Sequence, residues 1–363
     1  DYSGGIYELR ARAVEEREMR AMSFPQRLSE TGLFASVPEQ IPATGLVPYE
    51  IQHPMWSDGL VSKRWLGLTS EANIRVDDSR ASFPEGTVMV KTLSTPRSGT
   101  PVETQVMQRH RGAWRSFCYA WNDAQTDAEL VPSQGAEHMI GVGSNPNRFQ
   151  PWRSVSRSEC FVCHNAHVGG VLGLRRWQLG EAESERLEAL GVIDSPRRSR
   201  RGRRRPNQFT EGVHAARTYL EVNCASCHRK NGGGLVPMEL ERHLPNDRLA
   251  AINVTPQRGN FGIQDAKVID PGRPERSTLY YRMGMLGSGR MPHLGSQVVD
   301  AEGLALIYDW IESLDPKADR SMGSGDEVSQ ALVGLHTLGE AGVKDPSNPF
   351  IASLLRRFDV HGS

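Results

Sequence analysis

The chain has 363 residues, and its 43 basic and 43 acidic side chains give a formal net charge of zero. This balance argues against long-range attraction to nucleic acid or to an anionic membrane surface. The length allows two or three domains with a sizeable buried core. No apolar run approaches the roughly 20 residues that a membrane-spanning helix needs. We therefore expect no nucleic-acid partner and no transmembrane segment in this chain.

The first 150 residues predict a short helix followed by a β-rich domain. Residues 1–22 are charged with a thin apolar stripe, typical of a helix that is either docked against a partner or solvated. Residues 23–150 are expected to form the β-rich domain. Alternating segments at 87–93, 102–110 and 114–121 predict strands. Short strands between turns indicate an antiparallel sandwich or a partial barrel.

Two near-copies of one motif follow, Cys160-Phe161-Val162-Cys163-His164 and Cys224-Ala225-Ser226-Cys227-His228. Both read C-x-x-C-H, the attachment site of a c-type haem. Two thiols add across the two vinyl groups of one haem, and the adjacent histidine lies under the iron as its proximal ligand. We predict two covalently bound haem c groups, attached through Cys160, Cys163, Cys224 and Cys227, with His164 and His228 as proximal iron ligands.

Two other uses of these cysteines are less favoured. A zinc site with four thiolates usually has a much shorter intervening segment, and it does not explain a histidine after both pairs. A disulfide framework does not suit so long a chain. The fifth cysteine, Cys118, lies in a predicted strand, which favours a buried free thiol over a reactive one.

Covalent haem attachment takes place on the outer side of the bacterial inner membrane. We therefore expect a periplasmic or extracytoplasmic protein whose signal peptide was removed before residue 1. An anchor upstream of the chain, or membrane association through partners, stays an open alternative.

Residues 151–207 are expected to hold the first haem-binding segment and an arginine-rich linker. Positions 181–190 predict a short helix, and ten residues at 197–206 include seven arginines. The run is interpreted as a solvated loop between domains. The alternative is a local positive patch that docks an acidic redox partner.

Residues 208–316 predict a second haem unit. A helix is expected to start at Thr210 as its N-cap and to deliver Cys224 at its end. Positions 300–314 have the apolar spacing of an amphipathic helix. The remaining residues, 317–363, predict a helical extension in which we see no chemistry.

Residues 210–315 resemble a class I cytochrome c domain, with a helix, the C-x-x-C-H motif, a long loop containing Met291-Pro292 and a C-terminal helix. The resemblance implies that Met291 is the sixth ligand of the second haem, with Met283 and Met285 as competitors. The expected fold is therefore α+β. An antiparallel β-rich domain carries the first motif at its end, and a mainly α cytochrome c-like domain and a helical tail follow.

The wider chain, residues 23–315, resembles a family of bacterial di-haem c-type cytochromes, most of them uncharacterised. It departs from the family pattern at Gln178-Leu179-Gly180, where the family has Gln-Leu-Asn or Gln-Met-Asn. The resemblance implies periplasmic or surface-exposed electron transfer and no known substrate. It is carried by the segments 28–34, 56–59, 83–87, 121–128, 160–164, 172–174, 223–228 and 271–277.

The sixth ligand of the first haem is left open by the sequence. His167 is too close to His164 to reach the opposite face of the same ring, and His53 and Met55 are weak candidates. The candidates from the β-rich region are Met107, His110, His138 and Met139.

Two functions are compatible with these sequence features. The preferred one is a carrier that passes single electrons between redox proteins as part of a larger, membrane-associated electron-transfer complex. The other is a di-haem enzyme of the peroxidase type, in which the second haem feeds electrons to an open first haem. That enzyme needs an acid–base group over the distal face, for which His110 and His138 are formal candidates.

Overall fold

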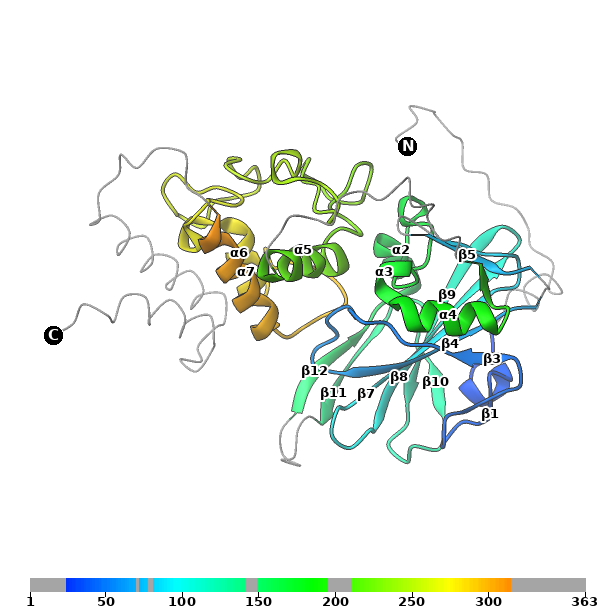
Figure 1. The fold of residues 1–363 in the computed structure, drawn as a ribbon. Coiled ribbons are helices and arrows are strands. Elements are labelled where there is room, and N and C mark those ends of the chain that lie inside the picture. Colours follow the sequence, from blue (N-terminus) through cyan, green and yellow to red (C-terminus); the bar gives the residue numbers. More distant parts are fainter. Residues whose placement is uncertain (1–23, 70–71, 78–80, 142–148, 195–210, 315–363) are drawn as a thin grey trace, which may run out of the picture.

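The computed structural model describes residues 24–69, 72–77, 81–141, 149–194 and 211–314 (Figure 1). The predicted N-terminal helix, the arginine-rich run and the predicted helical extension lie outside the described residues. Among the described helices, none combines the length and the apolar character that crossing a bilayer requires.

A six-stranded antiparallel sheet dominates the first part of the chain, which confirms its predicted β character. The strand order is β10-β9-β8-β7-β4-β3. The longest hairpin joins β8 and β9 through Arg111 and Gly112, whose φ angles of 51° and 73° suit a two-residue turn. The strands are β3 (Leu46–Pro48), β4 (Val61–Gly67), β7 (Val88–Ser94), β8 (Pro101–His110), β9 (Ala113–Trp121) and β10 (Ala128–Leu130).

The two faces of this sheet differ in chemistry. The register places Trp65, Val90, Val106 and Phe117 opposite one another across β4, β7, β8 and β9. This row is buried with Leu28 and Phe34, from the 3-10 turn η1 (Leu28–Thr31) and β1 (Phe34–Ser36). The neighbouring row, on the other face, consists of Arg64, Lys91, Gln105 and Cys118.

Among the described residues, three small sheets accompany the large one. β1 pairs with β2 (Ile41–Pro42), and β11 (Ala136–Gly141) pairs with β12 (Phe149–Ser154). In the third sheet β13 (Ile193–Asp194) runs parallel to β5 (Ile74–Val76), which pairs antiparallel with β6 (Ala81–Ser82).

Three short helices lie over the polar face of the large sheet (Figure 1). They are α2 (Arg157–Cys163), α3 (Arg176–Leu179) and α4 (Glu181–Ala189). A capping box starts α2, because the Ser156 hydroxyl accepts from the Glu159 N–H and the Glu159 carboxylate accepts from the Ser156 N–H. The apolar contacts beneath α3 and α4 include Leu174, Leu179 and Leu187.

The second part of the described chain packs around α5 (Glu211–Asn223), α6 (Thr278–Gly284) and α7 (Ala301–Ser313). Helix α7 begins at Asp300, whose carboxylate accepts from the Gly303 N–H. Gly303 allows a close crossing, since a Cβ there would collide with the ring of Tyr219 on α5. The helices thus form a core separate from that of the sheet.

The prediction of a mainly α cytochrome c-like domain is wrong. These three helices have only 13, 7 and 13 residues, and the long segments between them are irregular, so the described chain as a whole is β-rich. Backbone bonds such as Asn253 N–H to the Ile269 carbonyl hold the segment between α5 and α6. Positive φ angles at Asn231, Ala250 and Asn253 interrupt any helical continuation there.

Candidate functional site

The first C-x-x-C-H motif borders a cavity between α2 and the polar face of the large sheet. The cavity encloses about 1520 Å³ of space without protein atoms, part of it open to solvent. Cys160, Cys163 and His164 line it from the α2 side. The sheet contributes Arg64, Met89, Lys91, Leu93, Glu103, Gln105, Met107, Ser116 and Cys118.

His164 is held in the orientation of a metal ligand. Its Nδ1 lies 2.8 Å from the Gly170 carbonyl, so that Nδ1 donates and Nε2 keeps its lone pair. Burial lowers the pKa of His164 to about 4, which leaves the ring neutral. Gly170 has φ 87°, and a Cβ there would collide with the ring of Trp114. Glycine is therefore required where the chain turns to meet the histidine.

A third thiol lies near Cys160. Cys118 on β9 is free and only 5% exposed, and it lines the same cavity as Cys160. The Cys118 thiol is the largest cause that lowers the pKa of Cys160 to about 7, with a smaller contribution from Ser116. Cys160 and burial in turn raise the pKa of Cys118. The predicted burial of Cys118 is confirmed, but its place near the first motif was missed.

The second motif follows the end of α5 directly. Its histidine, His228, is 8% exposed, and its Nδ1 has no hydrogen-bond partner among the described residues. A Cβ at Gly234 would lie 2.9 Å from this Nδ1, so the chain passes close to the ring. Burial and then the charge of His293 lower the pKa of His228. The loop after Met291 therefore comes near the second motif.

The two motifs are in direct contact, although Cys160 and Cys224 are 64 positions apart. The Cys163 thiol is the largest cause that lowers the pKa of Cys227 to about 6. Cys227 Sγ lies 3.7 Å from the Val162 carbonyl. Both motifs therefore meet beside the same cavity.

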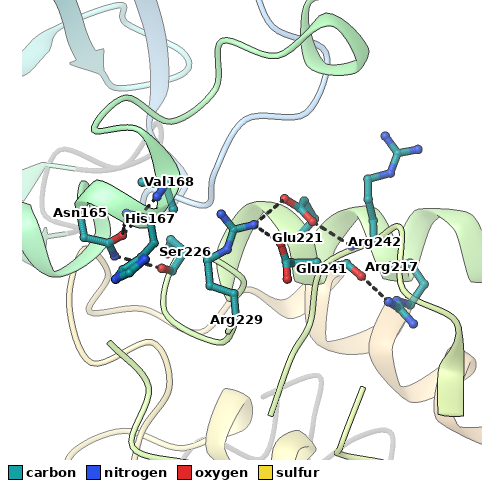
Figure 2. A network of polar contacts seen from close by, with 9 residues as sticks. All are labelled: Asn165, His167, Val168, Arg217, Glu221, Ser226, Arg229, Glu241 and Arg242. Atoms are coloured by element: carbon teal, nitrogen blue, oxygen red, sulfur yellow. Dashed lines mark hydrogen bonds and ion pairs between the residues drawn. The ribbon is translucent and has the colours of Figure 1, made fainter. Parts of the chain in front are cut away.

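Asn165 reinforces this junction from the turn after α2. Its side-chain amide donates to the Val162 carbonyl at 3.1 Å and to the Ser226 carbonyl at 3.2 Å. Its oxygen accepts from the His167 and Val168 N–H groups (Figure 2). One side chain thus ties the turn that follows the first motif to the second motif.

A buried ionic network fixes the chain just after the second motif (Figure 2). Arg229 pairs with Glu241 at 2.5 Å and with Glu221 of α5 at 3.9 Å. Arg217, 1% exposed, donates to the Glu241 carbonyl at 2.7 Å. The Arg242 N–H donates to the Glu221 carboxylate at 2.8 Å. These contacts hold the segment around His228 against α5.

Comparisons of the chain with protein-family models, with curated proteins and with solved structures found no match. The function therefore has to be argued from the motifs and from the geometry around them.

The four motif cysteines do not gather around one point. Cys160 lies near Cys118, Cys163 lies near Cys227, and Cys224 packs against the apolar core of the second part. Within the described ranges, no three His, Cys, Asp or Glu side chains are grouped to hold a metal ion. This arrangement does not favour a four-thiolate zinc site. It does not bear on haem iron, because the porphyrin supplies four of the ligands.

The predicted candidates for a sixth ligand of the first haem lie in different surroundings. Met107 is 7% exposed and lines the cavity. His110 ends β8, and His138 and Met139 belong to β11; none of the three belongs to the cavity lining, and Met139 is 60% exposed. The structure therefore brings one of the four predicted residues beside the first motif.

Three charged residues of the cavity were missed by sequence reasoning. Glu103 is fully buried and accepts from Gln105 Nε2 at 2.7 Å, from Trp152 Nε1 at 3.1 Å and from the Ser154 hydroxyl. Burial lowers the pKa of Arg64, and it lowers the pKa of Lys91 to about 8. The available signal was the even spacing along each strand from an apolar residue of the same face: Arg64 is two residues from Leu66, Lys91 two from Met89, and Glu103 four from Met107.

The methionines near the second motif also differ. Met291 is half-buried, precedes a cis peptide bond to Pro292, and its N–H donates to the Arg282 carbonyl at 2.8 Å. Met285 is 4% exposed within the apolar core, and Met283 packs against that core. Two of the three methionines are thus occupied in packing.

Proposed function

We propose that the protein is a di-haem c-type cytochrome that passes single electrons between redox partners outside the cytoplasm. The observation that carries the proposal is the direct contact of the two C-x-x-C-H motifs, with Cys227 Sγ 3.7 Å from the Val162 carbonyl, beside a cavity bordered by the first motif. Each motif has the spacing that covalent haem attachment needs. The proposed family is that of the bacterial di-haem c-type cytochromes.

The residues around the first motif fit a haem. Cys160 and Cys163 would attach it, and Nε2 of His164 would bind the iron, because Nδ1 is engaged by the Gly170 carbonyl. A bound haem supplies a centre that gains and loses one electron. The chain's own contribution is burial, a neutral imidazole and a sheet wall that limits access of water.

The second motif fits the same group. Cys224 and Cys227 would attach the haem, and the buried ring of His228 would face its iron. The close passage of Gly234 restricts the position of that ring. Electron exchange requires two centres to be close, and the contact of Cys227 Sγ with the Val162 carbonyl holds the two motifs side by side.

We assign Met107 as the sixth ligand of the first haem and Met291 as that of the second. Met107 is supported by its place in the cavity wall. Met291 is supported by the position of its loop near His228, while Met283 and Met285 pack in the core. A thioether opposite an imidazole raises the reduction potential of the iron.

One observation favours a second candidate, a peroxidase-like di-haem enzyme with an open sixth site on the first haem. Lys91 and Arg64 line the cavity near His164, and Glu103 lies on the same wall. Titratable side chains in a cavity could move protons for a bound peroxide. The candidate differs from the carrier in one measurable property, a free coordination position.

The first experiment is the intact mass and the absorption spectrum of the protein made in a host that attaches haem c. We expect two haem additions, one lost in Cys160→Ala/Cys163→Ala and the other in Cys224→Ala/Cys227→Ala. Cys118→Ala is the matched control and should keep both. The proposal is contradicted if the chain carries no haem when it is made in a host that attaches haem to other c-type cytochromes.

Carbon monoxide then separates the two candidates. An electron carrier with two methionine-ligated irons should give a reduced spectrum that carbon monoxide does not change. A spectral change assigned to the haem at His164 would instead support the enzyme, and hydrogen peroxide turnover would be measured next.

A further inference from the structure

A third thiol at the first motif is not used by the proposed function. One haem consumes two thiols, Cys160 and Cys163, and Cys118 is surplus. Cys118 nevertheless lines the same cavity as Cys160, on a strand against which α2 packs. Each of the two thiols shifts the pKa of the other, in agreement with this placement.

The relative position of Cys118 and Cys160 is set by two well-fixed pieces of backbone. Cys118 is held in register opposite Gln105, in the middle of the sheet. Cys160 lies on α2, whose start is fixed by the Ser156–Glu159 capping box. The fold therefore places the two thiols near each other, on fixed backbone and not on a flexible surface segment.

Each cysteine of the first motif lies near a cysteine outside the motif. Cys160 lies near Cys118, and Cys163 lies near Cys227, whose Sγ is 3.7 Å from the Val162 carbonyl. In the haem-free chain, an oxidant therefore meets thiol pairs other than the one within the motif. Only the Cys118–Cys160 pair contains a cysteine that haem attachment does not need.

We propose that Cys118 is a redox control on the loading of the first haem: in the haem-free chain it forms a disulfide with Cys160. This loading role rests on the proposed haem function. A low-molecular-weight disulfide such as oxidised glutathione is the oxidant. The two protein thiols lose two electrons and two protons, one disulfide forms, and one molecule of oxidised glutathione becomes two of reduced glutathione.

The disulfide blocks attachment for a chemical reason. Haem attachment adds an S–H group across a vinyl double bond, so the sulfur must carry hydrogen or be a thiolate. The Cys160 sulfur of a disulfide has neither, and it becomes competent again only after reduction by another thiol. While the Cys118–Cys160 disulfide is intact, the first motif would thus be unable to attach haem through Cys160.

Disulfide mapping of the haem-free chain tests the pairing. The whole chain is made in a reducing cytosol without haem attachment, purified reduced, and treated with oxidised glutathione under native conditions. Non-reducing peptide mapping should find the Cys118–Cys160 peptide as the main product of Cys160, lost in Cys118→Ser. A dominant Cys160–Cys163 product, or an unlinked Cys118 while Cys160 reacts, overturns the proposal. The wild-type result does not depend on how the variant folds.

Haem loading in cells tests the consequence. Wild type, Cys118→Ser and Cys118→Ala are produced with the attachment machinery, with and without added oxidised glutathione, and haem at each motif is quantified by peptide mass. With the oxidant, the variants should carry at least roughly twofold more haem at the first motif than wild type. The second motif is the internal control and should not change.

Two results at this stage have different meanings. Equal loading of the first motif in all three chains overturns the control by Cys118 and leaves the haem function intact. Absence of haem from both motifs in every chain overturns the haem function and with it the loading role, while the disulfide map still decides the Cys118–Cys160 pairing.

Discussion

Arg64 on β4 and Lys91 on β7 lie directly opposite each other in the sheet register, and both line the cavity beside the first motif. Like charges directly opposite on neighbouring strands are destabilising. Burial, and after it the charge of Arg64, lower the pKa of Lys91 from 10.5 to about 8. These two charges in the cavity wall therefore lower the stability of the folded chain.

Replacing Lys91 by methionine should stabilise the haem-free chain. Between pH 8 and 10.5 the unfolded chain binds more protons at this lysine than the folded chain does, so wild-type stability should rise with pH in this window. Lys91→Met should gain about 1–3 kcal/mol at pH 7, and the difference should shrink as pH approaches 10.5. Urea unfolding at several pH values measures this.

The matched control is Lys63→Met, at an exposed position of β4. It should change stability little at every pH. An equal gain in both variants would mean that the effect comes from general hydrophobicity instead of the cavity wall.

Asp58 should stabilise the contact between two segments that are far apart in the sequence. It is 4% exposed, and its carboxylate accepts from the N–H groups of Gln297 and Val298 at 2.8–3.0 Å. Asp58→Ala leaves these donors without their acceptor and should cost about 1–3 kcal/mol of unfolding free energy. Asp58→Asn keeps one oxygen and tolerates the φ of 54°, so it should cost less. Equal losses in thermal or urea unfolding would argue against this role of Asp58.

Glu103 should be needed for the stability of the cavity wall. Glu103→Ala removes the acceptor of Gln105, Trp152 and Ser154 and should lower the unfolding free energy by about 2–3 kcal/mol. The exposed Glu129 offers a control, because Glu129→Ala should change it by less than about 0.5 kcal/mol. Similar midpoints for the two variants in urea would contradict a structural role for Glu103.

Met107 should control access to the first iron if the proposed function holds. Met107→Leu keeps the side-chain volume and removes the thioether, so the reduced protein should bind carbon monoxide at the haem attached through Cys160 and Cys163. Met139→Leu, at the exposed β11 position, should leave the spectrum unchanged. Carbon monoxide binding by the wild type, or none by Met107→Leu, would remove Met107 from this role.

Local patterns were sufficient to predict part of the fold. The predicted strands at 87–93, 102–110 and 114–121 correspond to β7, β8 and β9, because alternation decides which side chains share a face. The apolar spacing at 300–314 likewise corresponds to α7. Each of these elements is specified by side chains close together in the sequence.

The parts that were missed depend on contacts between distant segments. No local pattern says that Arg64 lies opposite Lys91, or that Cys118 lies near Cys160, because strand register and helix placement decide both. The mainly α prediction failed for a related reason. The chain between α5 and α6 has little periodicity, and its shape comes from long-range backbone bonds such as that from Asn253 to Ile269.

The cavity beside the first motif also has a consequence for assembly. Part of its lining comes from Glu221 of α5, from Ser226 and Arg229 of the second motif region, and from Leu294 and Gly295. The first motif is therefore synthesised before the residues that complete its pocket. A chain cut between the two motifs would present a pocket with one wall missing, so the two parts are expected to mature as one unit.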